Sequence, residues 1–237
     1  MSTALKAALE DLLRRRRLQD DGPPLRGEDR RLCPLPTGLR GVDALVGGGL
    51  PRGELSEVYG PRSSGRTGLV LSLVAGCVGR GSLAAWVDPA DCFAPASAAA
   101  AGVDLARLLW LRGDMRGPRT RRLTEAVSAV ALLAGSGLFE VVVLDVAAFP
   151  AHDVGRLPGP TWIRLQRIVA DSPAALVLLA DAHVAHGPRG PSLELRADGP
   201  RWSGAAGPGR LLRGLGAELS VGRHRPRLAA FELEASV

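Results

Sequence analysis

The spacing of apolar residues predicts a separate helix near the start of this chain. Across residues 3–18, leucines recur at intervals of three and four, which places them on one face of a helix. These leucines are Leu5, Leu9, Leu12 and Leu13. Four arginines at 14–17 follow, where cations favour a helix end, and Gly22-Pro23-Pro24 ends the helix.

Residues 19–36 are polar and rich in proline, which predicts a linker. We therefore expect two parts, an N-terminal helix with its linker over 1–36 and a core domain over 37–237. A helix joined in this way must bury its leucine face, and two alternatives are open: its own core domain, or another subunit or partner protein. The four leucines are our candidate partner-binding residues.

From residue 37 onward, short apolar runs alternate with segments of helical periodicity. The runs lack polar alternation, which is typical of strands buried on both faces, and the helices between them indicate parallel strands. The predicted strands are 54–60, 83–88, 107–112, 140–146 and 174–181, and the predicted helices are 67–79, 96–101, 120–137 and 161–173.

After residue 190, apolar and polar positions alternate more clearly. The alternating segments are 191–197, 217–225 and 227–235, and this pattern indicates strands with one exposed face. We interpret them as an antiparallel extension of the sheet, with the last two forming a hairpin near Pro226. The predicted fold class is α/β, with a mostly parallel central sheet flanked by helices and a C-terminal antiparallel hairpin extension.

Composition changes this picture in three ways. Hydrophobic residues make up 46% of the chain and aromatic residues only 4%, so the core must consist of valine, leucine and alanine. A formal net charge of +6 suits an acidic partner, either nucleic acid or a protein surface. The three cysteines show no metal or disulfide spacing, and no apolar run reaches about 18 residues. We therefore expect a cytoplasmic protein with reduced thiols.

The stretch GPRSSGRT, residues 60–67, matches the phosphate-binding loop pattern G-x-x-x-x-G-K-[ST] except that arginine replaces lysine. In such a loop, backbone N–H groups and a helix N-terminus face phosphate oxygens. The candidate nucleotide-binding residues are Gly60, Pro61, Arg62, Ser63, Ser64, Gly65, Arg66 and Thr67. If ATP binds, Thr67 and Asp145, which follows an apolar strand, are the candidate Mg²⁺ ligands.

The run TGLRGVDALVGGGLPRGELSEVYGPRSSGRT, residues 37–67, resembles the RecA family. Weaker similarity continues through 86–95, 102–111 and 141–149, so the resemblance covers about residues 37–181. It implies a RecA-like P-loop NTPase core and a site for ATP with Mg²⁺.

The chain departs from the RecA pattern where hydrolysis is expected to depend on it. Arg66 replaces the loop lysine, Asp88-Pro89-Ala90 replaces the family's D-x-E, and Asp181-Ala182-His183 lies where the family has a glutamine. The missing glutamate is the group that would activate water. If the chain is active, Asp91 or His183 must replace these groups. The segments matching the family's DNA-contacting loops, 150–160 and 184–191, are short and contain prolines.

A small RecA-like core with a weakened ATP site resembles the ImuA family, which includes proteins described as SulA-like or RecA-like. This resemblance implies an accessory role in SOS-induced translesion synthesis and mutagenesis. The implied partners are an ImuB-like polymerase-related protein, an error-prone replicative-type DNA polymerase and RecA itself, with DNA binding and self-association as further contacts.

A basic stretch also has two interpretations. Its members are Arg112, Arg116, Arg119, Arg121 and Arg122. They either contact DNA phosphates or form a solvated, arginine-rich surface. For the whole protein, three functions are open: an accessory protein, a DNA-stimulated ATPase of the recombinase type, and a regulator that binds ATP without hydrolysing it.

Overall fold

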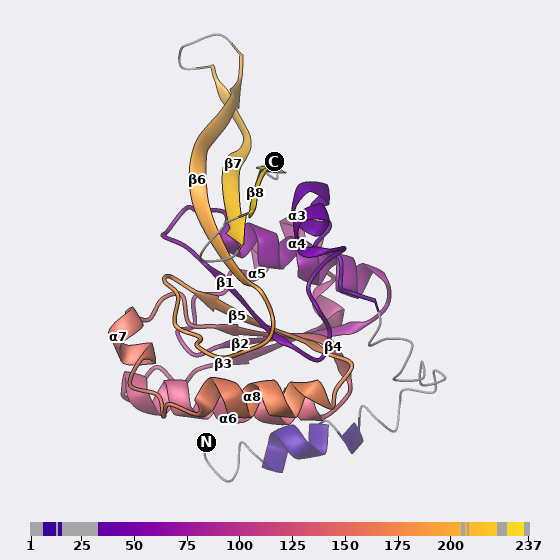
Figure 1. Cartoon of the computed structure of the whole chain (residues 1–237), viewed down its shortest axis with the longest axis vertical. Coiled ribbons are helices and arrows are strands. Elements are labelled where there is room, and N and C mark those ends of the chain that lie inside the picture. The colour runs from indigo at the N-terminus through magenta and orange to yellow at the C-terminus, as the bar shows by residue number, and fades with distance from the viewer. Residues whose placement is uncertain are drawn as a thin grey trace.

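An eight-stranded sheet runs through the computed structural model, which describes residues 7–12, 14–15, 33–204, 207, 209–221 and 227–234. In spatial order its strands are β3 (Leu108–Arg112), β2 (Leu83–Asp88), β4 (Phe139–Asp145), β5 (Ala175–Ala180), β1 (Leu55–Tyr59), β6 (Ser192–Ser203), β7 (Leu211–Val221) and β8 (Arg227–Glu234). The first six pair in parallel and the last two in antiparallel fashion. The predicted fold class is confirmed (Figure 1).

Helices cover both faces of the parallel part of the sheet. The α-helices are α3 (Arg40–Val46), α4 (Arg66–Gly79), α5 (Pro95–Ala100), α6 (Arg119–Gly135), α7 (Ala151–Val154) and α8 (Thr161–Ala170), and a short 3₁₀ turn, η1, spans Leu105–Arg107. Helices α6 and α8 lie on one face, with α3 and α4 on the other (Figure 1). None of the described helices is long and apolar enough to span a membrane.

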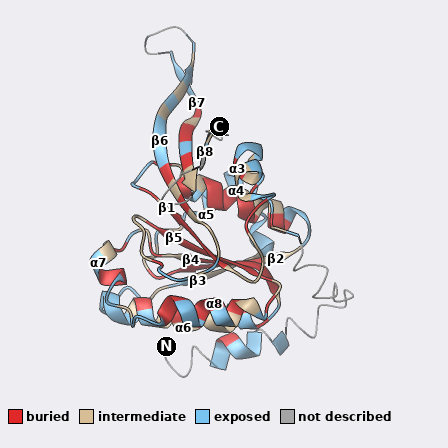
Figure 2. Cartoon of the chain, in the orientation of Figure 1, coloured by how far each residue is buried: buried red, intermediate tan, exposed pale blue. Residues whose placement is uncertain are grey.

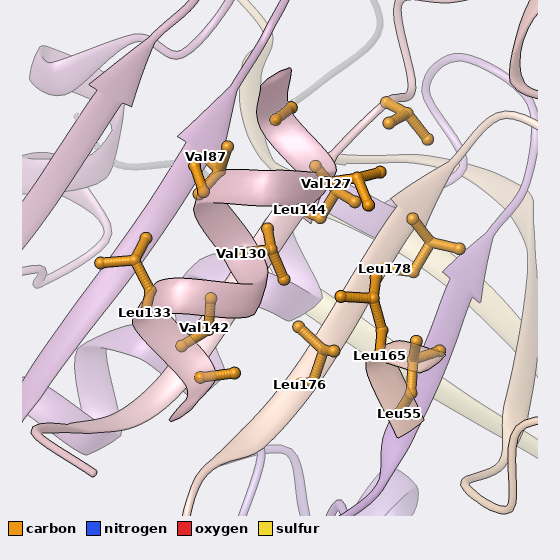
Figure 3. Close-up of a cluster of buried hydrophobic side chains, with 14 of the residues drawn as sticks. Leu55, Val87, Val127, Val130, Leu133, Val142, Leu144, Leu165, Leu176 and Leu178 are labelled. Atoms are coloured by element: carbon orange, nitrogen blue, oxygen red, sulfur yellow. The ribbon is translucent and has the colours of Figure 1, made fainter. Parts of the chain in front are cut away.

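The core is aliphatic, as the composition requires. On the face covered by α6 and α8, valines and leucines of α6 interdigitate with those of β4 and β5 (Figure 3). On the opposite face, Trp86 is completely buried in a second cluster that includes the apolar side of α4. The central strands are therefore buried on both sides (Figure 2), which explains their continuous apolar sequences.

The described part of the N-terminal helix packs on the core domain. Residues 7–12 form a helix beside α6 and α8 (Figure 1), and Leu9 is only 5% exposed in the cluster formed with these helices. Leu12 remains 40% exposed. Leu5 and Leu13 lie outside the described residues. Leu9 therefore packs on the chain's own core domain, which is the first of the two alternatives.

The C-terminal extension is larger than predicted. The antiparallel β7–β8 pair agrees with the predicted hairpin, but β6 continues to Ser203 and pairs with β7 as far as Leu211. Together β6 and β7 form a two-stranded arm that projects beyond the sheet (Figure 1). The arm's outer part has solvent on both faces, so its sequence lacks the alternation that identifies half-buried strands.

A buried ion pair joins five distant segments at the other end of the sheet. The Arg52 guanidinium donates to the Glu140 carboxylate of β4, to the carbonyl of Pro173 at 3.2 Å and to that of Cys33 at 3.1 Å. The Cys77 thiol of α4 donates to the same carboxylate at 3.0 Å. The Arg52 and Glu140 side chains are only 8% and 6% exposed, so each charge depends on the other.

These contacts set the protonation states of the cluster. Burial acts to raise the pKa of Glu140, but hydrogen bonds from Cys77 and Arg52 outweigh it and hold that pKa below its ordinary value. Burial also raises the pKa of the Cys77 thiol. Cys77 therefore stays protonated and acts as a donor to an ionised glutamate.

Replacing Glu140 by glutamine should lower the free energy of unfolding by about 3 kcal/mol, because the buried Arg52 loses its counter-charge. Urea unfolding at neutral pH measures the change. The matched control is Glu194→Gln, which disrupts an exposed pair with Arg196 and should cost less than about 1 kcal/mol. Equally small losses in the two variants would contradict a stabilising role for the buried pair.

The same cluster should make the fold sensitive to acid. Because the pKa of Glu140 is lower in the folded chain than the value of about 4.3 for a free glutamate, its ionised form stabilises the fold fully above that pH. The contribution is lost as pH falls through the lower, folded-state pKa. Urea unfolding at a series of acid pH values should show a steeper loss in the wild type than in Glu140→Gln. Parallel curves would refute the assignment.

Candidate functional site

A cavity of about 970 Å³ opens at the carboxyl ends of the parallel strands. Loop 60–67 follows β1, segments 92–97 and 145–150 follow β2 and β4, and Asp181 follows β5. Parallel strands deliver the segments that leave them to one edge of the sheet, where ligands of α/β proteins bind. The C-terminal strands close another side of the cavity through Pro200, Leu212, Gly214, Leu215 and Leu233.

Loop 60–67 has the tight backbone of a phosphate cradle. Gly60 has a φ of 157°, and a Cβ there would lie 2.2 Å from the carbonyl oxygen of Leu195. Gly65 has a φ of 89° and precedes the first turn of α4. The Ser64 hydroxyl is buried and has no hydrogen-bond partner among the described residues. Thr67 is exposed and lines the cavity.

Arg66 is turned inward rather than toward solvent. Its Nη1 donates to the carbonyl of Gly60, its Nη2 lies 3.5 Å from the carbonyl oxygen of Ala147, and the residue is only 8% exposed. Burial lowers the pKa of Arg66, while the nearby carboxylates of Asp145 and Asp181 act to raise it. The guanidinium thus connects the phosphate loop to the segment that follows β4.

Two carboxylates line the cavity beside this guanidinium. Asp145 ends β4, accepts a hydrogen bond from the Ala147 N–H at 3.1 Å and lines the cavity with Asp181. Burial raises the pKa of Asp145 to about 6, although the Ala147 N–H opposes the shift. Our sequence reasoning did not include Asp181 in the site; its position directly after a buried strand, like that of Asp145, was the available signal.

The candidate catalytic residues Asp91 and His183 are not among the described residues that line the cavity. Asp91 forms a two-point ion pair with Arg112, with both N–O distances 2.7 Å, and Arg112 lowers its pKa. Asp88, the strand-end aspartate, anchors the intervening turn by accepting from the Phe93 N–H at 2.8 Å. Ala90, at the position of the family's glutamate, offers no group that could activate water.

His183 instead contacts Glu57, a buried residue of β1 whose structural role the sequence analysis did not predict. The Glu57 carboxylate accepts from the backbone N–H groups of Val184 at 2.7 Å and Ala185 at 3.0 Å, and it also bonds Nδ1 of His183. These bonds fix the segment after β5. A glutamate inside the apolar strand LSEVY was the signal, because buried charges need partners.

The basic stretch lies on β3 and at the beginning of α6, and most of it contacts the chain itself. Besides the Arg112–Asp91 pair, Arg119 lies 3.5 Å from Asp153 and Arg121 lies 3.2 Å from Glu125. Arg122 donates to the carbonyl of Pro89 at 3.1 Å. Arg116 is exposed on the connecting loop. DNA contact by these five arginines stays a prediction.

The segment after β4 is folded rather than extended. Residues 151–154 form α7, and Asp153 is buried there with Arg119, Arg156 and His152 around it at 3.4–3.5 Å. The segment predicted to match the first DNA-contacting loop is therefore held to α6 by a buried carboxylate.

The backbone of loop 60–67 matches a nucleotide site, but the cation of the loop does not. The glycine conformations, the Ser64 hydroxyl, which has no partner in the described part of the chain, and the exposed Thr67 fit a bound phosphate. The loop cation does not, because Arg66 is committed to two backbone carbonyls. In the described part of the chain, no group of three or more acidic, histidine or cysteine side chains is arranged to hold a metal ion.

Comparison with known proteins identifies relatives for this architecture. A family model described as the RecA N-terminal domain matches residues 25–155, more than half of the chain. The RecA proteins of Lactobacillus acidophilus and Thermus aquaticus are each 38% identical to it, over 141 and 135 residues. These alignments cover 58% and 56% of this chain but only 37% and 38% of the relatives.

The chain therefore spans less than two fifths of the length of these curated relatives. The matched region includes the phosphate loop and β1 to β4, the elements that build most of the cavity. On the match to the family model and the fold that accompanies it, this chain belongs to the RecA family.

Proposed function

We propose that this protein is a RecA-fold accessory protein of the ImuA type in DNA-damage-induced translesion synthesis. It acts by binding partner proteins and turns over little or no ATP. The partners are an ImuB-like polymerase-related protein, an error-prone replicative-type polymerase and RecA, with DNA as a further ligand. A preserved scaffold with altered chemical groups supports this function.

One observation carries the proposal: the position of the family's water-activating glutamate presents no carboxylate to the cavity. Ala90 occupies that position, and the neighbouring Asp91 is held by Arg112. ATP hydrolysis depends on positioning the attacking water and stabilising the developing charge. Loss of the glutamate therefore removes the group that positions the water.

The N-terminal helix is the proposed docking element for a partner. Leu9 holds the helix on the core domain through the cluster with α6 and α8, which leaves Leu12 presented to solvent at 40% exposure. An exposed leucine on a helix that is already anchored costs little ordering entropy when a partner covers it.

ATP turnover should stay at background with or without single-stranded DNA. Phosphate release is measured beside Arg66→Ala, which controls for contaminating ATPases, and beside Thermus aquaticus RecA as a positive control. The wild type and the variant should release phosphate at the same low rate. Brisk, DNA-stimulated release that disappears in Arg66→Ala would instead support the recombinase-type ATPase and end the accessory proposal.

Capture of an ImuB-like protein should depend on the outward face of the N-terminal helix. Deleting residues 1–20 should abolish capture, and Leu12→Glu should weaken it about tenfold, which corresponds to about 1.4 kcal/mol. The matched control is Leu105→Glu, another leucine that is 40% exposed but lies on η1. Equal capture by all variants would exclude the helix as the docking element, and no capture by the wild type would contradict the proposed partner.

A further inference from the structure

We infer that Arg66 is an internal latch that excludes nucleotide polyphosphates from the phosphate loop, and that lysine at this position would admit them. The inference rests on the proposed function and adds to it how the loop discriminates against nucleotide. It concerns binding, whereas the proposed function concerns turnover and partner docking.

The latch is a set of contacts within the chain. Arg66 donates from one terminal nitrogen to the carbonyl of Gly60, at the beginning of the loop, and its other terminal nitrogen approaches that of Ala147, beyond β4. A guanidinium presents its donors in a rigid planar fork, so one side chain connects both walls of the cavity. A phosphate that recruited this cation would have to break contacts that are already buried.

Charge opposes such a rearrangement. The carboxylates of Asp145 and Asp181 attract the Arg66 guanidinium, and both line the cavity. If the guanidinium moved to a polyphosphate, these two aspartates would face several added negative charges in a partly desolvated space. Like charges repel each other more strongly where water is partly excluded.

The rest of the cradle is already shaped for an anion. Gly60 and Gly65 hold the backbone in conformations that only glycine adopts readily, and Ser64 offers a buried hydroxyl without a partner among the described residues. The cavity, at about 970 Å³, is within the upper range of small-molecule sites. The missing element is therefore a free cation at the lysine position of the loop, which a single substitution can supply.

Lysine at position 66 should abolish the contacts that form the latch and keep a positive charge at the site. Its ammonium carries all three donors on one atom at the end of an unbranched stem. It therefore lacks the fork that reaches from Gly60 to Ala147, while it keeps a positive charge near Asp145 and Asp181.

The test is ATP binding to the full-length chain, measured by calorimetric titration with Mg²⁺ and again with EDTA. Wild type should show no saturable binding up to millimolar ATP, and Arg66→Lys should bind at least about tenfold more tightly. The matched control is Arg164→Lys, an exposed arginine on α8 that is not among the described residues lining the cavity. It should behave as the wild type does. ATP should raise the melting temperature of Arg66→Lys alone.

Two results would overturn the latch. One is saturable ATP binding by the wild type as tight as that of Arg66→Lys, and the other is no gain by Arg66→Lys when it melts as the wild type does. If Arg66→Lys fails to fold, the wild-type titration decides: saturable binding refutes the latch and its absence supports it. ATP binding by the wild type without turnover would refute the latch but not the accessory function. Failure to capture the partner would contradict the proposed partner but not the latch.

Discussion

Strands β3, β2, β4, β5 and β1 pair in parallel and are covered by helices on both faces, so every chain segment that leaves them emerges at one edge. This constraint brings the loop after β1, the turn after β2 and the aspartates after β4 and β5 to a single cavity. It also explains why residues more than a hundred positions apart, such as Arg66 and Asp181, act on each other electrostatically.

Charged groups at this edge hold the structure together. Asp88 anchors a turn, Asp91 holds Arg112, and Glu57 fixes the segment after β5. Each carboxylate has partners that satisfy it, as buried or half-buried charge requires. Arg66 follows the same principle, because its donors serve the chain's own carbonyls. The edge that could bind a nucleotide is thus organised around internal contacts.

The C-terminal strands complete the site as well as the sheet. A Cβ on Gly68, at the beginning of α4, would lie 2.7 Å from Cδ1 of Leu233 in β8, and one on Gly65 would lie 3.2 Å from Cβ of Ala217 in β7. The phosphate loop is therefore packed against the antiparallel extension. The same extension lines the cavity and leads outward into the β6–β7 arm (Figure 1), so the base of that arm forms one wall of the cavity.

The sequence by itself determined the order of helices and strands in the parallel core and the position of the phosphate loop, because buried strands and amphipathic helices have local periods that survive without tertiary context. It also identified Arg66 as an unusual residue of the phosphate loop and Asp145 as an acidic residue at a strand end. Only the tertiary structure decided that Leu9 packs on its own domain, that Asp91 faces Arg112, and that β6 continues into an exposed arm. These outcomes depend on which distant groups share a buried space, and neither spacing nor composition encodes that directly.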